Sequence, residues 1–183
     1  MYIFLYFAIM LRAAFFTAVG VTFFVFWLIT DPSFEEKDTQ DEWPQVLAFS
    51  AVILTLAFAV PLLAQLAGRR DVFRLSLVPA AGAALGSAAN IVEDGLRMRW
   101  MFFGFVLSTS IILLGLLALT VALVRRGRVR ARLLAVVPAG TMAGLIFFVY
   151  AGGPVLLVTW LVAAALALVA PKATAVRTGV VTS

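Results

Sequence analysis

Long apolar stretches separated by short polar segments dominate the chain. Each stretch is close to the length needed to cross a hydrocarbon core about 30 Å thick. The stretches lack the strict alternation of barrel strands, and helices satisfy their own backbone groups in lipid. The pattern therefore predicts an all-α, polytopic transmembrane helical bundle over residues 1–171, followed by a short cytoplasmic tail, 172–183. The six predicted spans are 13–30, 46–67, 75–92, 100–124, 133–150 and 155–170.

The pattern allows more than one assignment of helices at the two ends of the chain. Only "AGGP" separates the last two spans, but one helix over 133–170 would be about 57 Å long, so a turn at Gly152, Gly153 and Pro154 is predicted. The first eleven residues are expected to extend the first helix or to lie along the inner interface, with Arg12 reaching towards headgroups. A 3+3 arrangement of inverted halves fits six spans, although only small-residue motifs in the third and fifth spans support it.

The basic residues predict the orientation. The loops "GRRDVFR" and "RRGRVRAR" are basic, whereas the first loop, "DPSFEEKDTQDEW", is acidic. With both termini in the cytoplasm, eleven of the fourteen Lys and Arg residues lie inside, which follows the positive-inside rule. The alanine-rich and arginine-rich composition fits a bacterium of high GC content. We therefore expect a multi-pass protein of the bacterial cytoplasmic (inner) membrane, with the acidic first loop outside and the basic loops on anionic headgroups.

Composition excludes several classes of function. Hydrophobic residues make up 64% of the chain and charged residues 13%, which a soluble domain of 183 residues could not bury. There is no cysteine or histidine, so disulfides, thiol chemistry, His-bound haem and the usual zinc and copper sites are excluded. We expect no metal and no cofactor. The net charge of +5 lies in short loops and acts as a topology signal, so no nucleic-acid partner is expected.

The third span carries the most unusual pattern. Spacings of four, four, three and four place Gly82, Gly86, Asn90, Glu93 and Arg97 on one stripe of a helix. Gly82 and Gly86 form a small-xxx-small motif on which another helix can approach closely. In the fifth span, Gly140 and Gly144 form a second face of this kind.

Two interpretations of this stripe remain open. In the first, Asn90, Glu93 and Asp94 form the floor of an outward cleft, where Arg97 and Arg99 hold an anionic group. In the second, the helix simply leaves the membrane here: Glu93 and Arg97 form an i, i+4 pair, Gly95 ends the helix, and Asn90 bonds to a neighbouring helix.

Sequence signatures of enzymes are absent. The chain has no Walker A loop, no G-x-S-x-G elbow and no H-E-x-x-H motif. Adjacent residues on a helix point about 100° apart, so Glu93 and Asp94 would not face one substrate as a catalytic pair. The first loop has six carboxylates but no EF-hand spacing, and solvated charge is the preferred interpretation. These six residues are Asp31, Glu35, Glu36, Asp38, Asp41 and Glu42.

Three classes of function remain, in order of preference. The first is a non-catalytic accessory or assembly subunit that packs on another membrane protein or on itself. The second is a solute-binding or transport protein that takes a small molecule. The third is a lipid-directed enzyme or lipid-binding protein that uses Asn90, Glu93 and Arg97.

The second class comes with a resemblance. In size, in its six-span plan and in its outer loop after the first helix, the chain resembles the substrate-binding membrane component of energy-coupling-factor importers. The spacing of Ala14, Ala18 and Thr22 is similar to the small-residue helix surface with which those components dock on their transporter partner. The resemblance implies a transport role and a docking surface on the first helix.

Overall fold

The computed structural model describes residues 2–30, 43–126 and 129–169, and in this part of the chain every regular element is a helix. The elements are α1 (Tyr2–Ile29), α2 (Trp43–Leu66), α3 (Arg70–Asn90), the π-helical turn η1 (Ile91–Gly95), the 3₁₀ turn η2 (Arg99–Met101), α4 (Phe102–Arg126), α5 (Val129–Leu134), α6 (Val136–Ile146), the π-helical turn η3 (Phe148–Gly152) and α7 (Gly153–Leu168). The all-helical prediction is confirmed.

Several of these helices are long and apolar enough to cross a membrane. Five segments of the described residues meet this condition, and a shorter apolar helical segment covers Ala131–Ile146. The five are Tyr6–Ile29, Trp43–Leu66, Arg70–Gly95, Arg99–Arg125 and Phe148–Leu168. Length and composition thus support the helical part of the membrane prediction, whereas the predicted fifth span, 133–150, and with it the count of six, stays a prediction.

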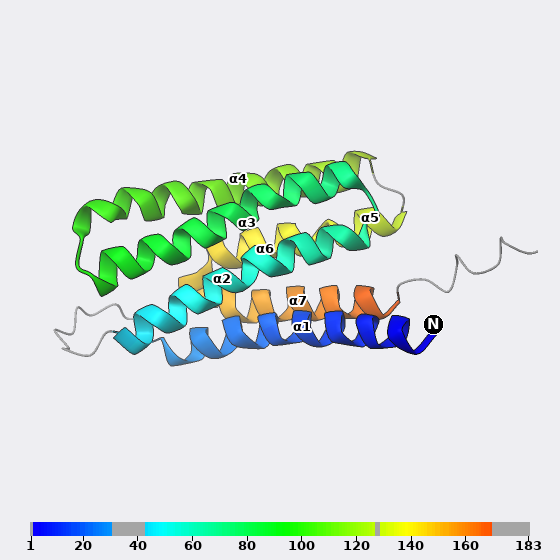
Figure 1. Cartoon of the computed structure of the whole chain (residues 1–183), viewed down its shortest axis with the longest axis horizontal. Helices are drawn as coiled ribbons and strands as arrows, with labels where there is room; N and C mark the ends of the chain where they lie inside the picture. The colour runs from blue at the N-terminus through cyan, green and yellow to red at the C-terminus, as the bar shows by residue number, and fades with distance from the viewer. Residues whose placement is uncertain (1, 31–42, 127–128, 170–183) are drawn as a thin grey trace, which may run out of the picture.

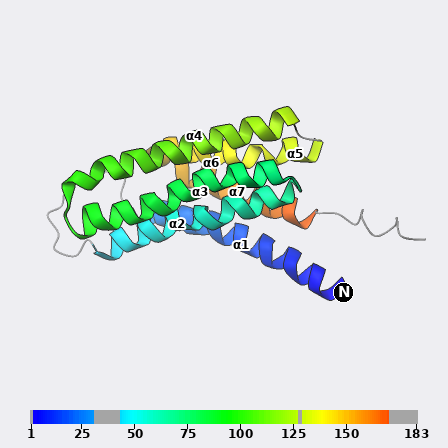
Figure 2. The ribbon, with the colours of Figure 1, turned by 45° about the horizontal axis from the view of Figure 1, so that its top comes forward.

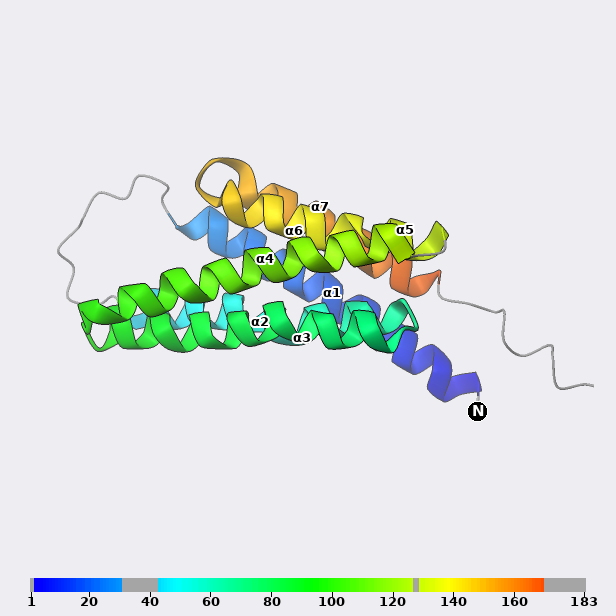
Figure 3. The ribbon, with the colours of Figure 1, turned by 90° about the horizontal axis from the view of Figure 1, so that it is seen from above.

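The helices pack as a ring that follows the chain. α1 packs on α2, α2 on α3, α3 on α4, α4 on α6, and α6 on α7, and the ring closes where α7 packs on α1. Figures 1 and 3 show these helices lying along roughly one common direction. The interior is filled by large apolar side chains, with Phe16, Leu56, Leu116 and Trp160 almost fully buried. The rings of Phe16 and Trp160 lie 5.7 Å apart, so α1 and α7 interlock directly.

Glycines mark the closest helix contacts. A Cβ at Gly82 would lie 3.0 Å from the backbone nitrogen of Ile112, and a Cβ at Gly115 would lie 2.8 Å from that of Pro79. These contacts fix an antiparallel register between α3 and α4. On the other side of the ring, a Cβ at Gly20 would lie 3.2 Å from the carbonyl oxygen of Leu157, which fixes α1 against α7 in the same way.

The packing repeats between the two halves of the chain. Each half contributes three helices, α1 to α3 and then α4, α6 and α7. The first helix of each half packs closely on the third helix of the other, because α1 lies on α7 and α4 lies on α3. Each of these two contacts passes through a glycine of the first helix, Gly20 or Gly115. The 3+3 arrangement of inverted halves stays a prediction.

The helix ends differ from the predicted spans, most clearly near both ends of the chain. α1 starts at Tyr2, so residues 2–11 extend the first helix, which was one of the two predicted alternatives, and Figures 2 and 3 show its first turns diverging from the other helices. The predicted span 133–150 is divided into α5, a turn at Ala135, α6 and η3. The chain reverses through η3, where Ala151 leaves helical geometry, and α7 begins at Gly153.

Candidate functional site

Asn90 ends α3 and is buried, with only 4% of its surface exposed. Its Nδ2 donates to Ser50 Oγ at 3.0 Å and to the carbonyl oxygen of Val46 at 3.3 Å, both on α2. A buried amide needs such partners because an unpaired one would cost about 1–3 kcal/mol. Asn90, which lies deeper in the third span than Glu93 and Asp94, is therefore bound to its neighbouring helix.

The α-helix changes into the π-helical turn η1 directly after Asn90. Glu93 is half-buried in this turn, and Asp94 next to it is exposed. Gly95 closes the turn beneath the ring of Trp43, because a Cβ here would lie 2.6 Å from Cη2 of that tryptophan. A π-helical turn has more residues per turn than an α-helix. The residues after it therefore lie on a different face from the one that a continuous α-helix would give them.

Arg97 and Arg99 lie beyond the end of the helix, and both are exposed. The backbone N–H of Leu96 donates to Ile91 and that of Met98 to Val92, which closes the turn. Arg97 adopts a φ of 56°, in the left-handed region that favours glycine. The sequence had suggested a helical i, i+4 pair of Glu93 with Arg97. This prediction is wrong, because the α-helix has already ended, and no ion pair joins the two residues.

The predicted cluster therefore divides into two groups. Asn90 turns inward to α2, whereas Glu93, Asp94, Arg97 and Arg99 follow one another along the connection to α4. No interaction in the described residues links Asn90 to a carboxylate or a guanidinium group. Among the described residues, no group of three His, Cys, Asp or Glu side chains could hold a metal ion. The six carboxylates of the first loop lie outside the described residues.

The predicted packing glycines lie at helix contacts. Gly82 and Gly86 face α4, where a Cβ at Gly86 would lie 2.9 Å from Ser108 Oγ. Gly140 and Gly144 face α7: the first lies against Thr159, and a Cβ on the second would lie 2.5 Å from Cγ of Leu156.

Hydroxyl groups in the spans mostly bond within their own helices. Ser108 Oγ donates to the carbonyl oxygen of Phe105 at 2.7 Å, and Ser110 Oγ to that of Val106 at 2.9 Å. Thr141 Oγ1 likewise donates to Val137 at 2.8 Å. Such bonds satisfy a hydroxyl group in an apolar surrounding without a ligand.

The small-residue spacing on α1 points away from the ring. Ala14, Ala18 and Thr22 are all exposed, whereas Phe16 and Gly20 on the opposite side are buried. Thr22 Oγ1 donates to the carbonyl oxygen of Ala18 at 2.8 Å, so its hydroxyl group is already paired. We call Ala14, Ala18 and Thr22 the α1 stripe. It forms a shallow, apolar helix surface.

Sequence reasoning missed the closest contacts around the ring. Gly20 and Gly115 both lie against the backbone of a neighbouring helix, and Gly153, which was predicted only as part of a turn, lies against Trp27. Gly20 and Gly115 are single glycines in apolar spans, and a lone glycine of this kind was the available signal. The contact of Arg12 Nη2 with Gln65 Oε1, at 3.3 Å, was also unforeseen as a pair.

These features define the class of the protein: an all-helical chain with several helices long and apolar enough to cross a membrane. The chain matches no protein-family model, and it has no significant match among curated proteins or solved structures.

Proposed function

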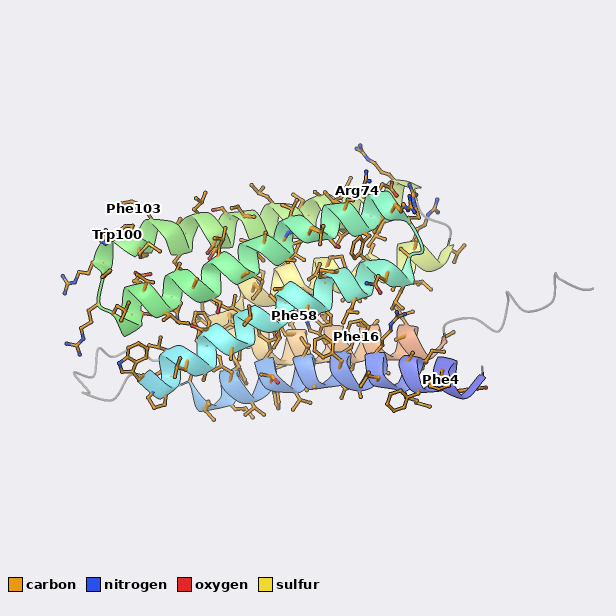
Figure 4. All side chains as sticks on the ribbon, viewed as in Figure 1. Phe4, Phe16, Phe58, Arg74, Trp100 and Phe103 are labelled. Atoms are coloured by element: carbon orange, nitrogen blue, oxygen red, sulfur yellow. The ribbon has the colours of Figure 1, made fainter. Side chains whose placement is uncertain are left out.

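We propose that the protein spans the bacterial cytoplasmic membrane six times, with both termini inside. The crossing that is not among the five long helices is the fifth in chain order. It is formed by α5 and α6 over residues 129–146, which cover about 27 Å at 1.5 Å per residue and nearly match the hydrocarbon core. Arg74 and Trp100 lie at opposite ends of the bundle (Figure 4), as expected for an inner basic end and an outer aromatic end.

We further propose that the protein is a non-catalytic subunit that docks on another membrane protein through α1. The observation that carries this proposal is the exposure of the α1 stripe, Ala14, Ala18 and Thr22. In lipid, helices associate where small residues let two backbones approach closely. The bundle uses the glycines of α3 in this way for its own packing, whereas it leaves the α1 stripe exposed.

The N-terminal turns of α1 extend this surface. Antiparallel contacts of Gly20 with Leu157 and of Trp27 with Gly153 place Arg12 level with the last turn of α7. Residues 2–11 therefore run beyond the end of α7, and Figure 2 shows them leaving the bundle. Phe4, Phe7, Met10 and Leu11 are among the exposed side chains there. A partner on the α1 stripe could cover these side chains as well.

The internal use of polar groups supports a docking role over a catalytic one. Asn90 binds α2, and Ser108 and Thr141 bind their own helices. The middle of the ring is filled by Phe16, Trp160 and leucines. These three polar groups of the spans thus serve the packing of the bundle.

Affinity isolation from its own membrane tests this proposal. The full native chain and the double variant Ala14→Leu/Ala18→Leu are each tagged, extracted in mild detergent and examined by native mass spectrometry. Ala118→Leu is the matched control, because Ala118 is an exposed alanine of α4 among the exposed residues Leu114, Leu117 and Val121. We expect a co-purified polypeptide or a second copy with the native chain and with the control, and its loss from the double variant.

Other outcomes of this isolation contradict the proposal. A partner that remains on Ala14→Leu/Ala18→Leu would place the docking surface elsewhere. A bare native chain, isolated under conditions that keep other membrane complexes intact, would remove the accessory role.

Solute transport is the second candidate. Each half of the chain contributes three helices to the ring, which is compatible with the predicted inverted halves, and inverted repeats underlie many transporters. The α1 stripe also matches the docking surface that the resemblance to importer components implies. In the same spectra, a small-molecule adduct that survives Ala14→Leu/Ala18→Leu and disappears in Asn90→Leu would favour transport.

A further inference from the structure

Arginines gather at the end of the bundle where α1 and α3 begin and α4 ends. We call this group the arginine end; Arg12 and Arg69 in it are half-buried, and its exposed members are Arg70, Arg74, Arg125 and Arg132. The members of the group come from α1, the α2–α3 connection, α3, α4 and α5. Figure 4 shows Arg74 projecting from α3 near this end, far from Trp100 at the other.

The helix register places several of these charges at similar depths. Gly82 faces Ile112 and Gly115 faces Pro79, so the start of α3 is level with the last turn of α4. Arg70 and Arg125 therefore lie at the same height on two helices in contact. Arg74 is one turn further along α3, about 6 Å nearer the middle of the bundle. A group held by all three would sit where headgroups meet the acyl chains.

Acidic side chains do little to neutralise this end. Asp71 accepts from Arg69, with Arg69 Nη2 2.5 Å from Asp71 Oδ2. No described carboxylate lies within ion-pair distance of Arg70, Arg74, Arg125 or Arg132. At the opposite end, by contrast, Arg97 and Arg99 are balanced in number by Glu93 and Asp94. Excess positive charge is therefore confined to one end of the described structure.

We infer that Arg70, Arg74 and Arg125 bind the phosphate of an anionic phospholipid at the α3–α4 edge. A guanidinium group offers several N–H donors in a planar fork that suits phosphate oxygens. Leu77 and Val78, one turn further along α3 than Arg74, are exposed apolar residues that would contact the acyl chain. This lipid site lies on other helices than the α1 stripe and does not depend on it.

Lipid retention in native mass spectrometry tests this inference. The delipidated full chain is exposed to equal amounts of phosphatidylglycerol and phosphatidylcholine, and retained adducts are compared with those of Arg70→Gln/Arg74→Gln/Arg125→Gln. Arg97→Gln/Arg99→Gln is the control from the opposite end. We expect the native chain and the control to retain more phosphatidylglycerol, and the triple variant to lose this preference by about fivefold or more.

Several results would overturn the lipid site. These are equal retention of both lipids by the native chain, unchanged preference in the triple variant, or an equal loss in the control. Displacement of phosphatidylglycerol by an equal concentration of inorganic phosphate would assign the arginines to a free anion instead. If the triple variant does not fold, Arg74→Gln alone must still reduce the preference, because Arg74 is exposed and unpaired among the described residues.

Discussion

α1 and α3 carry the same kind of sequence signal with opposite outcomes. Both have small residues four positions apart in an apolar helix, Gly82 and Gly86 on α3 and Ala14 and Ala18 on α1. On α3 the small residues face α4, Gly82 against its backbone and Gly86 against Ser108, whereas on α1 they face outward. The glycines of α3 are satisfied within the chain, so a surface for another molecule is better sought on α1.

The comparison also distinguishes residues that hold helices together from residues that bind another molecule. The stripe of α3 leads to Asn90, which suggested a binding site, but the amide binds Ser50 of α2 and helps to hold the same packing. Changes on α3 should therefore lower the stability of the bundle. Changes on the α1 stripe should leave the bundle stable and affect only what binds to it.

The largest expected loss of stability is at the α3–α4 contact. In Gly115→Ala, the new Cβ would lie 2.7 Å from Cδ and 2.8 Å from the nitrogen of Pro79, and neither atom can move freely. We expect a loss of about 1–3 kcal/mol, measured by thermal unfolding in detergent. Gly104→Ala is the control, because its Cβ would meet nothing closer than 3.5 Å. Equal melting temperatures for the two variants would disprove the tight contact.

Asn90→Leu should have the next largest effect. It removes the donor to Ser50 Oγ and to the carbonyl oxygen of Val46, and we expect a loss of about 1 kcal/mol. In the Asn90→Leu background, Ser50→Ala should then lower the stability hardly any further, because the hydrogen bond between the two residues is already lost. If the effects of the two substitutions simply add in a double-mutant cycle, Asn90 does not act through Ser50.

Ala18→Leu should leave stability almost unchanged, within about 0.5 kcal/mol, because the side chain is exposed. Binding of a partner, in contrast, should be lost. The two measurements are thermal unfolding of the purified chain and co-purification from membranes. A large drop in melting temperature would show that the α1 stripe packs within the chain.

Glu93→Gln should have the smallest effect, a few tenths of a kcal/mol. Glu93 is half-buried in η1 and has no ion pair with Arg97, so removing its charge breaks no contact between helices. Thermal unfolding would measure this. A change comparable to that of Asn90→Leu would return Glu93 to the candidate site.

The sequence was sufficient for the helical class because the apolar runs report length and burial in lipid directly. It was also sufficient for the close approach at Gly82 and Gly86, since only small residues permit it. The π turn after Asn90 and the left-handed Arg97 could not be predicted, because Trp43 from another helix packs over Gly95 there.

The candidate site depended on the same kind of information. The pairing of Asn90 with Ser50 needs the register of α2 against α3, which no local pattern in the chain specifies. The outward direction of Ala14 and Ala18 follows from the contact of Gly20 with α7, on the opposite side of α1. Both depend on which helices meet, and the spacing of residues within one helix leaves that open.

Site-specific photocrosslinking in native membranes tests the central claim most directly. A photoreactive residue is placed at Ala18 on the α1 stripe, at Ala118 on α4, or at Gly104 beside α3. We predict that position 18 alone forms a crosslink to another polypeptide or to a second copy of the chain. If position 18 gives only lipid adducts, as Ala118 is expected to do, the α1 stripe faces the bilayer and the docking role is wrong.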